Sequence, residues 1–289
     1  MTATIDLAPA EAAGEFRPEG ATAVRRQTLA GAIRSEWIKI RTLRSTWVGL
    51  ASTLLVLVGF GAIAAAVSTG SVATPDAGGG SDAFGGVGAV STVLTGANFA
   101  VLLMGILGAL AGAREYASRM IAATVAAVPR RWQVVVAKAT VFTGIGFVTS
   151  VIGVFGAFFV GMAVLSGADA ATVSLADDGV LRQVLGMAAY ITAVGLIGLG
   201  LGILLRSVAG AIGAVVAGVM VLPALAGALL PDSWAPILQY LPSSAAAGFT
   251  TVQAAGSDVL GAGAGALVLA AWVVAILAAA VLSITRRDV

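Results

Sequence analysis

The sequence predicts an all-α integral membrane protein with six transmembrane helices. Three observations lead to this fold class: 59% of the 289 residues are hydrophobic and only 10% are charged, the apolar residues gather into six long stretches, and the basic residues concentrate in alternate connecting segments. A soluble protein would need six unusually long and uniformly apolar core helices in one chain. The composition therefore favours a chain that crosses a bilayer.

Each apolar stretch has the length of a membrane span, because about twenty helical residues at roughly 1.5 Å each cover the hydrocarbon core. We expect spans at residues 46–67, 93–113, 139–165, 184–205, 208–230 and 260–284. All of the 16 lysines and arginines except Arg182 fall on one side of this topology. Because positively charged loops stay in the cytoplasm, both termini are expected to be cytoplasmic, in a plasma membrane protein. The net charge of +2, with basic residues near the span ends, favours a lipid bilayer and not nucleic acid as the partner.

The N-terminal part predicts two segments before the six-span domain of residues 46–289. Residues 1–24, rich in Ala, Glu and Pro, predict a disordered cytoplasmic tail. Residues 25–45 predict an amphipathic helix, since apolar residues recur there at three- and four-residue steps. Its apolar stripe includes Ile33, Trp37, Ile40 and Trp47. We expect this helix to lie in the cytoplasmic interface; the alternative is a plain extension that satisfies the positive-inside rule.

The longest internal cytoplasmic connection joins the second and third spans. Ser118 can cap a short helix there, and Pro129 would stop it because proline clashes with the preceding turn. This predicts a helix of about two to three turns parallel to the membrane. The connection between the fourth and fifth spans is barely Arg206 and Ser207, so only the first of these loops is large enough to be a docking surface.

Other features concern helix packing and the outer face. Small residues spaced four apart predict close helix approach, at Gly108 with Gly112, Gly198 with Gly202, and Gly261 with Gly265. Pro223 should kink the fifth span. Residues 231–259 are apolar but too short and broken to span, which predicts a re-entrant or interfacial helical segment before the last span.

Several kinds of chemistry are missing from the sequence. No predicted span carries an ionisable residue near its middle, and Lys138 and Arg182 are expected to snorkel to the interface. This lowers the case for a proton-coupled transporter, although sodium coupling through backbone carbonyls stays open. The chain has neither His nor Cys, so the commonest zinc sites and Ser/His or Cys/His nucleophile pairs cannot be built. Neither of its two lysines, Lys39 and Lys138, follows a Gly-rich phosphate-binding loop. The chain itself is therefore not expected to be an enzyme.

Three segments of the sequence form a recognisable set. They are SEWIKIRTLRSTW at 35–47, REY at 114–116 with Thr124 and PRR at 129–131, and YLPS at 240–243. Together these segments resemble the permease subunits of type-2 ABC exporters, in the form common in actinobacteria. The resemblance covers most of the chain from about residue 25, and its first segment is the most specific.

The resemblance implies a six-span subunit paired with a second permease copy, identical or different, and with ATP-binding cassette ATPase subunits. ATP and Mg would then be bound by the partner, and this chain would hold no cofactor or metal. It also implies a coupling helix that docks on the ATPase, mapping here to residues 115–132. The residues expected at or beside the docking helix are Arg114, Glu115, Tyr116, Arg119, Met120, Thr124, Arg130 and Arg131. The cargo, an amphiphilic drug, peptide or lipid-like molecule, is not identified by the resemblance.

Two other interpretations remain open from the residues alone. A secondary transporter or channel would move its substrate without a partner. A membrane scaffold would transport nothing and stimulate no ATPase.

Overall fold

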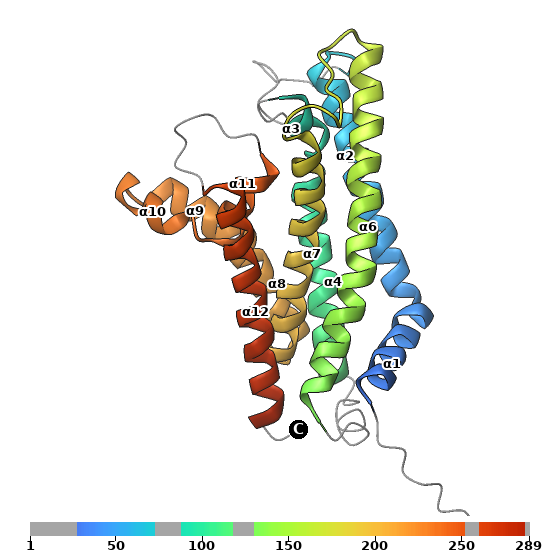
Figure 1. The fold of residues 1–289 in the computed structure, drawn as a ribbon, viewed down its shortest axis with the longest axis vertical. Helices are drawn as coiled ribbons and strands as arrows, with labels where there is room; N and C mark the ends of the chain where they lie inside the picture. The colour runs from blue at the N-terminus through green and yellow to red at the C-terminus, as the bar shows by residue number, and fades with distance from the viewer. Residues whose placement is uncertain (1–27, 73–87, 118–129, 252–259, 287–289) are drawn as a thin grey trace, which may run out of the picture.

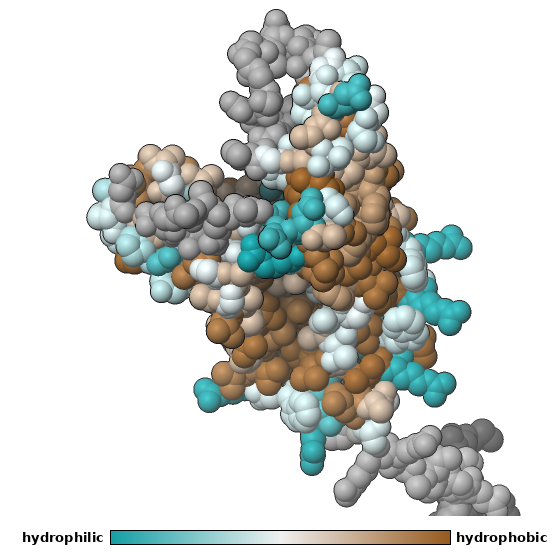
Figure 2. Space-filling model, turned by 45° about the horizontal axis from the view of Figure 1, so that its top comes forward, coloured by the Kyte–Doolittle hydropathy of each residue, from teal (hydrophilic) through white to brown (hydrophobic). Residues whose placement is uncertain are grey.

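The computed structural model describes residues 28–72, 88–117, 130–251 and 260–286. Within these ranges the chain is helical and contains no strand. Six helices are long and apolar enough to cross a membrane, and apart from the second half of the fifth they run side by side as a bundle (Figure 1). Apolar side chains cover much of the flank of this bundle in Figure 2. The prediction of a multi-span, all-helical membrane protein is thereby confirmed in its coarse form.

The six spans fall where hydropathy predicted them. They are α2 (Arg44–Ser68), α4 (Ala97–Ala117), α6 (Trp132–Gly167), α7 (Val180–Leu205), a composite fifth span, and α12 (Ala262–Arg286). Helix α6 begins seven residues earlier than the predicted third span, and its 36 residues extend for about 54 Å. A short helix, α3 (Ala89–Val93), precedes α4, so the second span starts later than predicted. The backbone breaks at Gly96, where a Cβ atom would collide with the carbonyl of Leu57.

The fifth span is irregular, as the proline predicted. It consists of α8 (Val208–Val216), the π-helical turn η1 (Ala217–Val221) and α9 (Leu222–Leu229). Pro223 has no N–H to donate to the preceding turn, so the helix changes its hydrogen-bonding step just before it. Beyond this point α9 projects from the bundle together with α10 (Ala235–Leu238), as Figure 1 shows.

Helices α4 and α7 form the closest pair in the bundle. A Cβ atom on Gly108 would collide with the carbonyl of Gly195, and one on Gly112 with the carbonyl of Leu199. From the α7 side, a Cβ atom on Gly198 would collide with the Gly105 carbonyl of α4. The predicted glycine spacings in these two helices therefore do mark close backbone approach. In the third pair only Gly265 has this role, since Gly261 lies before α12 and has open space around it.

Around this central pair, α2 and α6 pack on one side and α12 on the other. The short helix α11 (Pro242–Thr250) packs against α7 and α12, and the turn η2 (Asp232–Trp234) leads into α10. Tyr240, between α10 and α11, accepts a hydrogen bond at its carbonyl from Trp272 Nε1 of α12 (2.9 Å). The described part of the segment predicted to be re-entrant, residues 231–251, is thus mostly helical and hydrogen-bonded to the last span.

The amphipathic segment forms α1 (Leu29–Thr42), capped at its start by the Thr28 hydroxyl and separated from α2 by extended Leu43 alone. Trp37 and Trp47 are about half exposed, which suits contact with an interface. The face of α1 that is buried in the bundle carries Ala32 and Glu36. Ile33 and Ile40 of the apolar stripe are half-buried beside this face, and only the two tryptophans of the stripe are exposed.

Candidate functional site

A cluster of four charged side chains joins α1, α4 and α6. Lys39 Nζ lies 2.7 Å from Glu36 Oε1 and 2.7 Å from Glu115 Oε1. Lys138 Nζ lies 2.9 Å from Glu36 Oε2 and 2.7 Å from Glu115 Oε1. Each lysine therefore contacts both glutamates, and the four charges balance.

Three of the four side chains are removed from solvent. The exposed fractions are 7% for Glu36, 8% for Lys138 and 13% for Glu115, against 40% for Lys39. Charges removed from water are tolerated when they are paired and hydrogen-bonded, and removing one partner costs about 3–5 kcal/mol. Loss of any buried member of the cluster should therefore strongly destabilise the contact between these helices.

The helices bring the four residues together through simple spacing. Glu36 and Lys39 are three residues apart on α1 and so lie on one face. Glu115 is in the last turn of α4, and Lys138 is in the second turn of α6. These two helices lead into and out of the loop that separates them. The cluster therefore holds α1 against the two helix ends that flank the loop, at the end of the bundle where α12 also ends (Figure 1).

The environment keeps Lys39 charged. Burial lowers the pKa of its ammonium group, but the hydrogen bonds and negative charges of Glu115 and Glu36 act the other way. The net pKa of Lys39 is raised above its usual 10.5. Its positive charge is therefore stable throughout the physiological pH range.

The residues on either side of Glu115 reach two further helices. Arg114 Nη1 donates a hydrogen bond to Ser45 Oγ at the start of α2 (3.0 Å). The Arg206 guanidinium lies 5.2 Å from the centre of the Tyr116 ring. Arg206 adopts a left-handed conformation (φ 52°) directly after α7, which a non-glycine residue adopts at a cost. The three consecutive residues thus attach the end of α4 to α2, to α1 and α6, and to the α7–α8 junction.

The structure places the predicted docking residues in two groups. Arg114, Glu115 and Tyr116 belong to the last turn of α4 and not to the loop where the sequence suggested them. Arg130 is exposed just before α6, and Arg131 Nη1 donates to the Ile284 carbonyl of α12 (3.3 Å). Arg119, Met120 and Thr124, with the expected helix between Ser118 and Pro129, lie outside the described residues. The docking role of all eight stays a prediction.

The interpretation of Lys138 as a snorkelling residue is wrong. Its ammonium group points into the bundle, because the carboxylates of Glu36 and Glu115 lie there and form ion pairs with it. Sequence reasoning also assigned no role to Glu36. One signal could have found the cluster: both lysines of the chain, and both glutamates beyond residue 24, are its four members.

Among the described residues, no group of three or more His, Cys, Asp or Glu side chains is arranged to hold a metal ion. Comparison of the chain with models of known protein families and with curated protein sequences finds no match.

Proposed function

We propose that this chain is the permease subunit of a type-2 ATP-binding cassette exporter, which moves an amphiphilic drug, peptide or lipid-like cargo across the plasma membrane. Its partners would be ATPase subunits, which bind ATP and Mg, and a second permease copy. In this proposal both termini are cytoplasmic, α1 lies in the inner interface, α10 and α11 form the outer re-entrant segment, and residues 118–129 contain the coupling helix.

The observation that carries the proposal is the charge cluster at the two helix ends that flank residues 118–129. A loop that receives force from a docked ATPase must pass it to the membrane helices. Glu115 and Lys138 stand at its two ends, and Glu36 and Lys39 bind both of them to α1. Displacement of the loop would therefore move α1, α4 and α6 together.

The bundle also has parts that differ in how firmly they are held. Helices α4 and α7 touch at glycine backbones, whereas the fifth and sixth spans are mostly exposed in this single chain. Tightly packed helices move as a unit and loosely packed ones can shift against them. This supports a mechanism in which the cargo path opens by rearrangement around the α4–α7 pair.

The experiment is purification of the tagged full-length chain in mild detergent, followed by a search for a bound ATPase with a Walker A loop. Arg119→Glu and Met120→Asp should release that ATPase while the variants still insert in the membrane. Arg182→Glu, at the opposite end of the bundle, is the matched control and should retain it. The proposal fails if no ATPase accompanies the wild-type chain, or if every loop variant retains it as the control does.

A further inference from the structure

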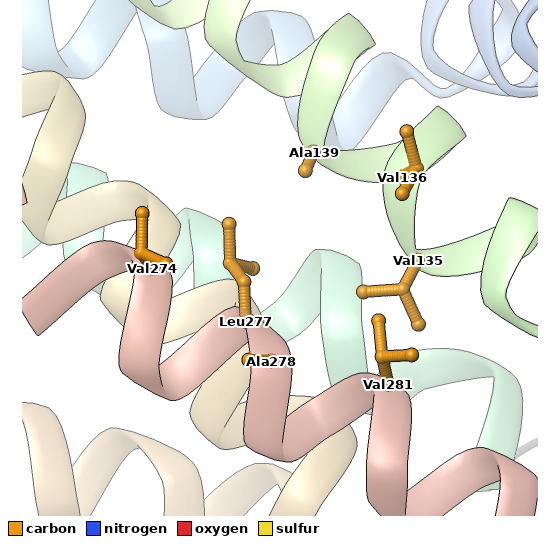
Figure 3. Close-up of a pocket in the computed structure, with 7 residues that line it drawn as sticks. All are labelled: Val135, Val136, Ala139, Val274, Leu277, Ala278 and Val281. Carbon is orange, nitrogen blue, oxygen red and sulfur yellow. The ribbon is translucent and has the colours of Figure 1, made fainter. Parts of the chain in front are cut away.

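An apolar groove of about 250 Å³ lies between α6 and α12. Every side chain that lines it is aliphatic, and Figure 3 shows the two sets on either side of an open gap. The lining residues that matter here are Val135, Val136 and Ala139 of α6, with Leu277, Ala278 and Val281 of α12.

The groove follows from how α12 is held. This helix packs mainly against α7 and α11 and only lightly against α6. Ala139 and Ala278 are too short to close the space between the two helices. Protein interiors and bilayers do not leave such apolar space empty, because its lining would lose dispersion contacts. A flexible hydrocarbon chain fits a narrow channel of this kind.

The end of the groove toward the helix termini is basic and aromatic. Arg131 directly precedes α6, one turn before Val135. Its hydrogen bond to the Ile284 carbonyl places the guanidinium between α6 and α12, one turn beyond Val281. Trp132 precedes Val135 by three residues, so it continues the groove-lining stripe of α6, and it is 38% exposed. An arginine beside a half-exposed tryptophan is typical of the headgroup level of a bilayer.

We propose that this groove binds an anionic phospholipid of the inner leaflet, with one acyl chain between α6 and α12 and the phosphate at Arg131. Exposed Arg130 and Arg286, at the same ends of the two helices, add positive charge around the phosphate. The inference rests on the membrane orientation in the proposed function and not on the ATPase. Lipid bound there would stabilise the contact between α6, which carries Lys138, and the last span.

The test uses the purified full-length chain, delipidated in detergent and titrated with phosphatidylglycerol or with phosphatidylcholine of the same acyl chains. Native mass spectrometry counts the lipids that stay bound. We expect one phosphatidylglycerol per chain to be retained in preference to phosphatidylcholine. Arg131→Gln should weaken phosphatidylglycerol binding about fivefold, while the matched control Arg182→Gln should leave it unchanged.

A second pair of variants tests the groove itself. Ala278→Phe should fill the groove and abolish the preferential binding of phosphatidylglycerol, whereas Ala275→Phe, on the same helix but outside the groove lining, should not. If Ala278→Phe does not fold, Ala278→Leu takes its place. Equal binding of the two lipids, or equal effects of the two alanine variants, would overturn the proposal. The proposal would also be overturned if the wild-type chain were a dimer that Ala278→Phe dissociates, because the groove would then be occupied by a second copy of the chain. Whether these variants still bind the ATPase is measured separately, so a failure of the lipid proposal can be distinguished from a failure of the proposed function.

Discussion

Replacing Lys138 with methionine should destabilise the protein more than the loss of any other basic side chain among the residues that the structure describes. Methionine has a similar length and removes only the charge. Glu36 Oε2 then loses its ion pair with Lys138 (2.9 Å). Glu115 Oε1 also loses Lys138 and is left with one of its two lysines, Lys39. Two buried carboxylates would share one ammonium group that is itself 40% exposed.

The expected loss is about 3–5 kcal/mol, the cost of leaving a buried charge without its partner. The assay is the unfolding midpoint of the detergent-solubilised protein, followed by tryptophan fluorescence. Exposed Arg182→Met is the control and should change the free energy of unfolding by no more than about 0.5 kcal/mol. The double variant Glu115→Gln/Lys138→Met restores neutrality, so its loss should fall short of the sum of the single losses by about 0.5–3 kcal/mol. Additive losses, or a Lys138→Met midpoint equal to that of the control, would show that the charge cluster does not stabilise the protein.

Three further predictions concern packing, pH and the outer segment. Gly108→Ala should cost about 1–3 kcal/mol, because the new methyl group meets the α7 backbone; Gly144→Ala, with open space around it, should be neutral or stabilising, and thermal unfolding of the two variants compares them. The contribution of Lys39 should be complete below its usual pKa and disappear as the pH rises through its raised pKa. The gap between the wild-type and Lys39→Met midpoints should therefore be constant up to about pH 10 and narrow above it; a gap that narrows near neutral pH contradicts this. Trp272→Phe removes the hydrogen bond to the Tyr240 carbonyl, so limited proteolysis should cut the α10–α11 segment faster, with the overall midpoint lowered by only about 1 kcal/mol.

The sequence was sufficient to predict the number of long helices, because each span is a separate run of apolar residues that hydropathy detects on its own. It also predicted the close approach of α4 and α7, since Gly108 and Gly198 mark it by their spacing. Helix ends were less predictable. Helix α6 starts at Trp132 and α4 continues through Tyr116, because a helix can run through charged residues such as Lys138 and Arg114, which end the apolar run that hydropathy measures.

The charge cluster could not be predicted from local pattern. Lys138 lies at the edge of an apolar stretch, where a lysine ordinarily reaches for the headgroups. Its partners are 102 residues away at Glu36 and 23 residues away at Glu115, so only the packing of three helices decides where its ammonium group goes. The scarcity of lysine in the chain was the one sequence signal that pointed to it.

The most direct test of the account is the rate of MgATP hydrolysis by the material purified through the tagged chain and reconstituted in liposomes. We predict hydrolysis that belongs to a separate bound subunit and that is lost with that subunit in Arg119→Glu, while the chain alone neither hydrolyses ATP nor moves cargo against a gradient. Sustained uphill transport by the chain alone would contradict the account.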